Sequence, residues 1–284
     1  MARLPGWPRC RREAPPGKRG RSIRWRPKNA RRGGREGPGA AWSSGGEGRR
    51  ARARRVQNGR VHRRASIHKR TLVSIICITY NHEQYIAQAL DNFLSQKHDN
   101  FDLEVIVADD ASEDRTQQII SKYASAFPQT IQPILQEKNV GIQNNLFDAL
   151  NRAKGQYIAL CEGDDYWIND EKLSMQLSYM EAHHDTTVCF HPVKVLYEGV
   201  TKVASAPEIF PERVFRHSPT RMRLLATNYI QTNSVMYRRL ATYHQPDSTI
   251  LPLDWYLNIL HATTGEVACV SPDVPLSVYR RHAG

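Results

Sequence analysis

The 284-residue chain consists of two parts of opposite charge that meet near residue 70. Residues 1–70 contain 23 of the 40 Lys and Arg residues and three of the 28 acidic residues, which leaves 17 basic and 25 acidic residues for 71–284. This mildly acidic larger part is typical of a soluble enzyme and argues against a nucleic-acid-binding face there. No run approaches the ~18–20 apolar residues of a membrane-spanning helix, and the N-terminus lacks the apolar core of a signal peptide. The five scattered cysteines have neither disulfide-framework nor zinc-site spacing, which favours a reducing, cytoplasmic location.

Residues 1–70 are rich in Arg, Gly and Pro and contain few aliphatic residues. Such a segment cannot bury enough apolar surface to offset the entropy of ordering, so we expect it to be disordered. Its basic run at residues 49–55 can bind the phosphates of RNA, DNA or anionic lipid, and peripheral association with the inner face of a membrane is one reading of it. The alternative is a segment without function, because nothing in it specifies a partner.

From Thr71 onward, apolar patterns predict strands and helices that alternate. Ile86, Leu90 and Phe93 have helical spacing, Ser112 is a plausible N-cap for a second helix, and a third helix is expected over 144–153. The strands are expected at 73–79, 103–108, 131–136 and 156–161. This alternation predicts an α/β fold with a doubly wound, mostly parallel sheet.

Three polar clusters directly follow predicted strands. They are Thr79-Tyr80-Asn81, Asp109-Asp110 and Glu162-Gly163-Asp164-Asp165. Ligands of open α/β sheets bind at the carboxyl ends of the strands, so we expect the three clusters to converge on one edge. Any one of them alone is also explained as a turn or a helix cap, but three in succession favour a site.

The carboxylates of the third cluster indicate a hard divalent cation, Mg²⁺ or Mn²⁺. Such a cation bridges the phosphates of a diphosphate group and stabilises that group as it leaves. Glycoside hydrolysis without metal also uses two carboxylates, but it does not explain the other polar strand ends. The sequence contains neither the GxGxxG loop of dinucleotide-binding proteins nor a P-loop.

The order of these segments resembles the family 2 glycosyltransferases, which have the Rossmann-like GT-A fold. The matching segments are Val73–Asn81, Asp109–Asp114 (the family's DDxSxD turn), Asn139–Gly141 with Asn144-Asn145, Glu162–Trp167 (its DxDD turn) and Asp170–Gln176. Three positions differ from the family pattern. Ala111 replaces the usual Gly, Glu162 replaces the first Asp, and Asn145 stands where an Arg is usual.

The resemblance implies roles for the matching residues on the donor side. Thr79, Tyr80 and Asp110 are implied to hold the nucleotide base, with Asn81 in the same wall. Asn145 stands at the position that contacts the diphosphate, where one cationic contact is therefore missing.

In the acidic turn, Glu162 retains a carboxylate with a longer reach, and Asp164 is implied to contact the ribose and the metal region. Asp164 or Asp165 is implied to bind the cation, Mg²⁺ or Mn²⁺.

On the acceptor side, Asp254 is implied to be the base that deprotonates the acceptor in a single inverting displacement. It lies just before a helix expected over 255–261, so a role as helix N-cap is the alternative. Asp247 and Glu266 are weaker candidates for the base. The closing segment Tyr279–His282 resembles the family's YRxH segment, whose His approaches the metal or the diphosphate.

Together these features predict an inverting, metal-dependent hexosyltransferase of polysaccharide or glycoconjugate biosynthesis. The donor is expected to be a UDP-, GDP- or dTDP-sugar, and the acceptor a saccharide, a lipid-linked group or a protein. Residues 71–165 are expected to form the nucleotide-sugar-binding half and 166–284 the acceptor half, and we interpret the end at residue 284 as a C-terminal truncation. Two rival hypotheses are a catalytically impaired protein that binds nucleotide sugars, and a nucleic-acid-binding protein that acts through residues 1–70.

Overall fold

The computed structural model describes residues 70–202, 205–247, 249 and 252–283. Apart from Arg70, the segment expected to be disordered lies outside these residues, and so does the basic run on which the nucleic-acid hypothesis depends. Four of the cysteines lie in the described part and are unpaired. Within the same part, no helix is long and apolar enough to cross a membrane.

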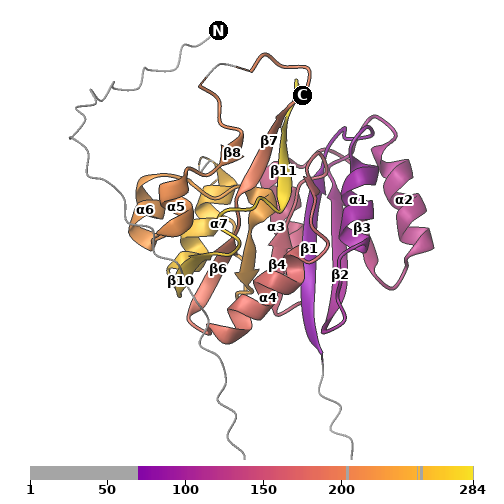
Figure 1. Cartoon of the computed structure of the whole chain (residues 1–284). Helices are drawn as coiled ribbons and strands as arrows, with labels where there is room; N and C mark the ends of the chain where they lie inside the picture. The colour runs from indigo at the N-terminus through magenta and orange to yellow at the C-terminus, as the bar shows by residue number, and fades with distance from the viewer. Residues whose placement is uncertain (1–69, 203–204, 248, 250–251, 284) are drawn as a thin grey trace, which may run out of the picture. The chain divides into compact units, whose positions relative to one another are not determined.

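The larger of two sheets has seven strands (Figure 1). They are β1 (Thr71–Thr79), β2 (Phe101–Asp109), β3 (Ile131–Leu135), β4 (Tyr157–Leu160), β6 (Thr186–Phe190), β9 (Met236–Arg238) and β10 (Glu266–Cys269). Their spatial order is β10–β6–β9–β4–β1–β2–β3, and only β9 runs antiparallel to its neighbours. The mostly parallel α/β sheet and the four predicted strands are thus confirmed. Pro133 is accommodated because β3 is an edge strand.

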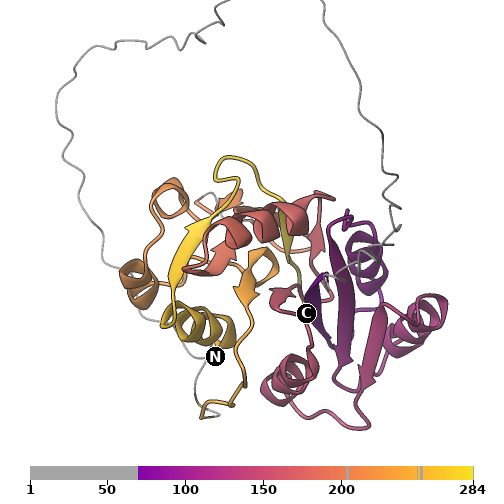
Figure 2. The same cartoon turned by 90° about the horizontal axis from the view of Figure 1, so that it is seen from below.

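Helices lie on both faces of this sheet, as the view from below in Figure 2 shows. They are α1 (Ile86–Leu94), α2 (Thr116–Ala126), α3 (Ile142–Arg152), α4 (Lys172–Ala182), α5 (Arg213–His217), α6 (Arg221–Ala226) and α7 (Leu253–Ala262), with a 3-10 turn, η1, at Thr232–Ser234. The side chains of β1 alternate between two cores. Ile75 and Cys77 pack with α1 and α4, whereas Ile76 packs with α3 and α7. Because β1 is buried on both faces, its sequence is a continuous apolar run.

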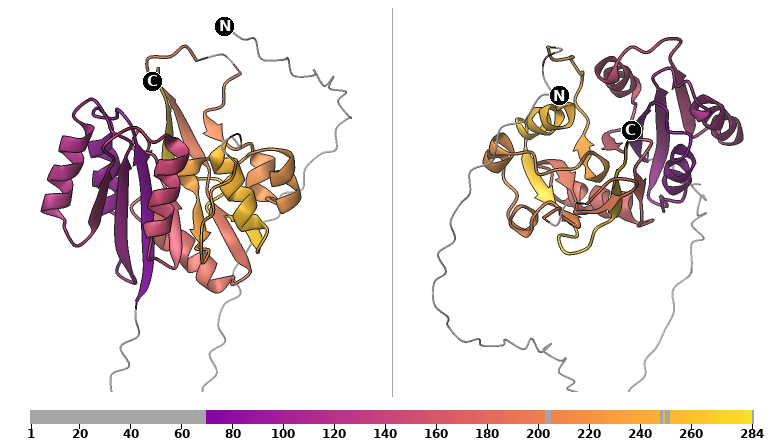
Figure 3. Two further views of the ribbon diagram at one scale, coloured as in Figure 1. Left: turned by 180° about the vertical axis from the view of Figure 1, so that it is seen from behind. Right: turned by 90° about the horizontal axis from the view of Figure 1, so that it is seen from above.

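A second sheet joins the C-terminal end of the described chain to the segment that follows the acidic turn. Its strands are β5 (Tyr166–Trp167), β7 (Val193–Tyr197), β8 (Ile209–Phe210) and β11 (Ser277–Arg281). β11 lies between β5 and β7, and Val278 is paired with Tyr166. Figure 3 shows this C-terminal strand between the N-terminal half of the sheet and the later elements. The sequence did not indicate this pairing.

The expectation that Ser112 caps a helix is wrong. Helix α2 begins only at Thr116, whose N–H donates to the Asp114 carboxylate at 2.9 Å. The Ser112 hydroxyl instead donates to Asp109 and accepts the N–H of Asn81 at 2.8 Å. A local bond from Ser to Asp competes with helix formation, so this segment forms a loop that ties two strand ends together.

Lys172, at the start of α4, is fully buried. Its Nζ lies 3.9 Å from the centroid of the Trp167 ring and has no hydrogen-bond partner among the residues described. Burial lowers the pKa of Lys172 from 10.5 to about 7. The unfolded chain binds this proton up to a higher pH than the folded chain does, so the free energy of unfolding rises with pH between these two values.

Replacing Lys172 with Met should therefore stabilise the protein near pH 7 and remove this pH dependence. The wild-type protein should gain up to about 1.4 kcal/mol of unfolding free energy per pH unit in the window, since that is the value of one pKa unit. Urea unfolding at pH 7, 8 and 9 measures the slope, with Lys122→Met at an exposed position of α2 as the control. Equal slopes for the wild type and Lys172→Met would contradict the prediction.

Candidate active site

The carboxyl ends of β1, β2 and β4 meet at one edge of the sheet, as the sequence indicated. The N–H of Asp110 donates to the carbonyl of Thr79 at 3.0 Å, and the N–H of Gly163 donates to Ile78 at 3.0 Å. Gly163 is required by this approach, because a Cβ there would lie 2.8 Å from Thr79 Oγ1. The three polar clusters are thus brought together by the backbone itself.

Asn81 holds the loop after β1 to the loop after β2. Its side-chain carbonyl accepts the N–H of Glu113 at 2.9 Å, while its own N–H donates to Ser112. Both loops contain a non-glycine residue in the left-handed region, Asn81 at φ 58° and Ala111 at φ 60°. The value at Ala111 explains why the family prefers Gly at that position. Asn81, expected in the substrate wall, faces the neighbouring loop, and it does not line the pocket described next.

A pocket of about 410 Å³, called here the nucleotide pocket, opens at these strand ends. Its lining is Ile78, Thr79, Tyr80, His82, Asp110, Asn139, Gly141, Ile142, Asn145, Glu162 and Asp164. The side chain of Tyr80 is 41% exposed and therefore available to a ligand, whereas that of Thr79 is only 3% exposed. Thr79 Oγ1 is buried in this wall without a hydrogen-bond partner in the described part of the chain. Leaving a buried hydroxyl unpaired is costly, so a polar group bound beside it would be stabilised.

Two of the residues that were expected to bind substrate form hydrogen bonds to the protein backbone. The carboxylate of Asp110 accepts the N–H groups of Val140 and Gly141 at 2.7 and 3.0 Å, so it shapes the loop before α3. Asn145 is 2% exposed and donates to the carbonyl of Ala108 at 2.8 Å. Both residues line the pocket, but neither supplies a positive charge, and its lining contains no Lys or Arg.

The acidic turn brings one oxygen atom each from Glu162, Asp164 and Asp165 within 4.8 Å of one another. Asp165 is 1% exposed, and its two oxygens accept the Arg280 N–H at 2.7 Å and the Asn233 amide at 2.9 Å. Asp164 faces the nucleotide pocket, and its Oδ1 has no partner among the described residues. Asp164 is therefore better placed than Asp165 to meet a ligand.

Burial and mutual repulsion raise the pKa values of two carboxyl groups in this turn. Burial, followed by the charges of Asp164 and Asp254, raises the pKa of Glu162 to about 8. Burial and the same kind of repulsion raise the pKa of Asp165. A divalent cation would relieve the repulsion between these carboxylates, and the unpaired oxygen of Asp164 could coordinate it. The residues present therefore fit Mg²⁺ or Mn²⁺.

Two histidines that flank Asp164 were only partly indicated by the sequence. His282 Nε2 lies 3.1 Å from Asp164 Oδ2, as its place in the closing segment suggested, and His82 Nε2 lies 3.8 Å from the same oxygen. Burial lowers the pKa of His82. His82 directly follows the first polar cluster, and that position was the one signal that could have identified it.

Arg280 and Asn233 support the acidic turn from distant parts of the chain. The Arg280 guanidinium donates to the carbonyl of Asp164 at 2.6 Å and lies 4.4 Å from the centroid of the Tyr85 ring. Asn233 Nδ2 donates to the carbonyl of Val278 as well as to Asp165. No local pattern in the sequence identifies Asn233.

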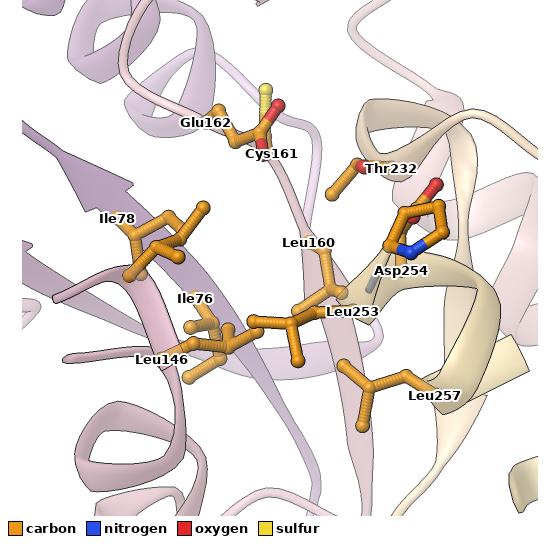
Figure 4. A pocket seen from close by; sticks show the side chains of 12 residues that line it. Ile76, Ile78, Leu146, Leu160, Cys161, Glu162, Thr232, Leu253, Asp254 and Leu257 are labelled. Carbon is orange, nitrogen blue, oxygen red and sulfur yellow. The ribbon is translucent and has the colours of Figure 1, made fainter. Parts of the chain in front are cut away.

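A second pocket, of about 470 Å³, lies beside the nucleotide pocket and contains Asp254 (Figure 4). Asp254 is in the first turn of α7, which begins at Leu253 after Pro252 at the N-cap position. The N-cap alternative for Asp254 and the helix start at residue 255 are therefore wrong. The Asp254 carboxylate accepts the amide of Asn228 at 2.7 Å, which fixes its orientation.

The weaker candidates for the base lie elsewhere. Glu266 pairs with Arg221 at 3.0 Å, and Asp247 accepts two hydrogen bonds from Thr249. Neither residue lines either of the two pockets. Of the three carboxylates considered for the base, Asp254 alone faces one of these pockets.

The mostly parallel sheet with an acidic turn at its strand ends is an α/β fold of the GT-A type, and residues 74–243 match the model of "Glycosyl transferase family 2". The chain belongs to this family. An uncharacterized protein of Mycobacterium tuberculosis is 48% identical over 211 residues, which cover 74% of this chain and 59% of that protein. The poly(ribitol-phosphate) beta-N-acetylglucosaminyltransferase TarS of Staphylococcus aureus is 30% identical over 162 residues, 57% of this chain and 26% of its own length. The chain therefore spans about three fifths or less of the length of these relatives.

Solved structures show the same fold. S. aureus TarS 1–349 in complex with UDP superposes with a TM-score of 0.58 at 24% identity, covering 74% of this chain and 60% of that one. The mannosyltransferase PcManGT from Pyrobaculum calidifontis, in complex with GDP-Man and Mn²⁺, gives a TM-score of 0.54 at 20% identity over 74% of this chain and 57% of that one. The predicted GT-A fold is thereby confirmed.

Proposed function

We propose that the protein transfers a hexosyl group from a nucleotide diphosphate sugar to an acceptor hydroxyl, with inversion and with the help of a divalent cation. The observation that carries the proposal is the position of the acidic turn. Asp164, with its free oxygen, faces the nucleotide pocket, and Asp254 faces the adjoining pocket. Glu162 lines both pockets, so the turn would lie between the side that binds the phosphates and the side that holds the base.

Thr79, Tyr80 and Asp110 would hold the nucleotide in this proposal. Thr79 Oγ1 offers the buried hydroxyl without a partner, Tyr80 offers an exposed ring, and Asp110 fixes the loop that closes the pocket. Residues 71–165 would form the donor half, and 166–284 would supply the base and the acceptor side. TarS has been solved with UDP and with UDP-GlcNAc and PcManGT with GDP-Man, which supports a nucleotide sugar as donor and leaves UDP, GDP and dTDP open.

Glu162 and Asp164 would hold Mg²⁺ or Mn²⁺, whose chemistry is to neutralise the diphosphate as it leaves. Asp254 would take the proton of the acceptor hydroxyl while that oxygen forms its bond to the anomeric carbon. The bond from this carbon to the diphosphate oxygen breaks in the same step, and the nucleoside diphosphate departs with the electron pair. Attack from the side opposite the leaving group inverts the configuration.

The acceptor would be a saccharide, a lipid-linked group or a protein in polysaccharide or glycoconjugate biosynthesis, in a cytoplasmic reaction that can take place at the membrane surface. Relatives support this setting. They include the TarS enzyme and an Escherichia coli glucosyltransferase that acts on GlcNAc-diphosphoundecaprenol, 38% identical over 110 residues that cover 39% of this chain and 41% of that enzyme.

Asp164→Asn should weaken Mn²⁺-dependent binding of the cognate nucleoside diphosphate by at least about tenfold, because one charged ligand of the cation is lost. Calorimetric titration of UDP, GDP and dTDP, with Mn²⁺ and with EDTA, identifies the base and measures the effect. Asp170→Asn is the matched control, since Asp170 is half exposed and pairs with Lys97 on the surface. Equal binding with and without metal, or equal loss in both variants, would contradict the proposal.

A catalytically impaired nucleotide-sugar-binding protein is the second candidate. It is favoured by one observation, the commitment of Asn145 to the Ala108 carbonyl in a pocket lined without Lys or Arg. Sugar release from the cognate donor in the presence of Mn²⁺ distinguishes the two. Binding without turnover would support the second candidate.

A further inference from the structure

The pocket that contains Asp254 is polar along one side, called here its rim, and mostly apolar elsewhere. Figure 4 shows Glu162, Thr232 and Asp254 around its upper part, with aliphatic side chains below them. Those aliphatic residues are Ile76, Ile78, Leu146, Leu160, Leu253 and Leu257, and we call the space that they enclose the apolar chamber. None of these six side chains can accept or donate a hydrogen bond.

The apolar chamber adjoins the nucleotide pocket. Ile78, Ile142 and Glu162 line both spaces. A group joined to a diphosphate in the nucleotide pocket would therefore lie next to the chamber, on the side of Glu162. Ile76 of β1 and Leu160 of β4 are paired in the central sheet and line one side of the chamber, called here its floor. Both are almost fully buried, so the sheet bounds the chamber on this side and the chamber suits a short group.

A fully hydroxylated hexose is poorly matched to such walls. A hydroxyl directed at the floor would lose its water without gaining a partner, whereas a methyl group would gain from burial. The rim offers carboxylates and the Thr232 hydroxyl to the remaining sugar hydroxyls. The arrangement thus fits a sugar with one apolar side and one polar side.

We infer that the donor sugar carries an apolar substituent, the methyl of a deoxy sugar or of an N-acyl group, and that this substituent occupies the apolar chamber. The inference rests on the proposed function, because it places the sugar through its diphosphate. It goes beyond that function by naming the class of sugar that the site selects.

Matched donor pairs test the inference. UDP-6-deoxyglucose against UDP-glucose, GDP-6-deoxymannose against GDP-mannose, and dTDP-6-deoxyglucose against dTDP-glucose each differ by one hydroxyl. UDP-GlcNAc against UDP-glucose tests the N-acyl group. Competition with the cognate nucleoside diphosphate in Mn²⁺, on the full chain, should show tighter binding of the apolar member of at least one pair by about 10- to 100-fold.

Polar substitutions in the chamber should remove this preference. Leu253→Asn places an amide on its wall in the first turn of α7, and Leu146→Asn does so from α3; neither residue lines the nucleotide pocket. Leu225→Asn, on an exposed position of α6 away from the chamber, is the control. Each chamber variant should bring the ratio towards one while the affinity for the nucleoside diphosphate stays unchanged.

The outcomes distinguish failure of the apolar chamber as the sugar site from failure of the proposed function. Binding of the nucleoside diphosphate with a ratio near one in every pair overturns the apolar chamber as the sugar site. A wild-type preference that survives in both chamber variants also overturns it. Absence of metal-dependent nucleotide binding overturns the proposed function, and the inference falls with it.

Discussion

Replacing Asp254 with Asn should lower the rate of sugar release from the cognate donor by about 10²- to 10⁴-fold, the usual contribution of a general base. The substitution keeps the shape of the side chain and its contact with Asn228, which donates to the carboxylate at 2.7 Å. It removes the group that takes the acceptor proton. Because Asp254 does not line the nucleotide pocket, the affinity for the nucleoside diphosphate and Mn²⁺ should change little. Turnover by product analysis and binding by calorimetry measure the two effects separately.

Glu266→Gln and Asp247→Asn are the controls for this result, because both carboxylates were considered for the base and neither lines a pocket described above. Both variants should retain near wild-type turnover. Wild-type turnover in the Asp254→Asn variant would show that another residue is the base. A loss confined to Glu266→Gln or Asp247→Asn would identify which one.

The central sheet could be predicted from the sequence because its strands are local and buried on both faces. The apolar composition of a run such as residues 73–79 is enough to predict a buried strand. Because ligands of such sheets bind at the strand ends, Thr79, Asp110 and Asp164 are then predicted to lie close together. No contact between distant residues is needed for this step. The convergence of the three polar clusters on one edge of the sheet was accordingly predicted, whereas the orientation of Asn81 towards the neighbouring loop was not.

The support of the acidic turn depends on contacts between distant residues, and it could not be predicted in the same way. Val278 pairs with Tyr166 across more than a hundred residues, and this pairing carries the Arg280 N–H to the carboxylate of Asp165. A five-residue strand with mixed polarity gives no periodic signal that names its partner. The same contacts change the interpretation of Asp165, which the family motif alone suggests as a metal ligand.

Asp165→Ala should reduce the free energy of unfolding by about 2–5 kcal/mol. The substitution leaves two buried donors, the Arg280 N–H and the Asn233 amide, without acceptors, and each such loss costs about 1–3 kcal/mol. It also loosens β11 from the turn, since both donors are tied to that strand. Asp164→Ala, at a side chain that is 21% exposed with one free oxygen, should change stability by less than about 1 kcal/mol.

Metal binding should show the opposite pattern. Asp164→Ala should lose Mn²⁺ affinity, whereas Asp165→Asn, which retains one acceptor oxygen for the buried donors, should bind Mn²⁺ nearly as well as the wild type. Urea unfolding and titration of Mn²⁺ by electron paramagnetic resonance measure the two properties on the same variants. If Asp165→Asn keeps its stability but loses Mn²⁺, Asp165 is a metal ligand after all, and its bonds to Arg280 and Asn233 must break when the cation binds.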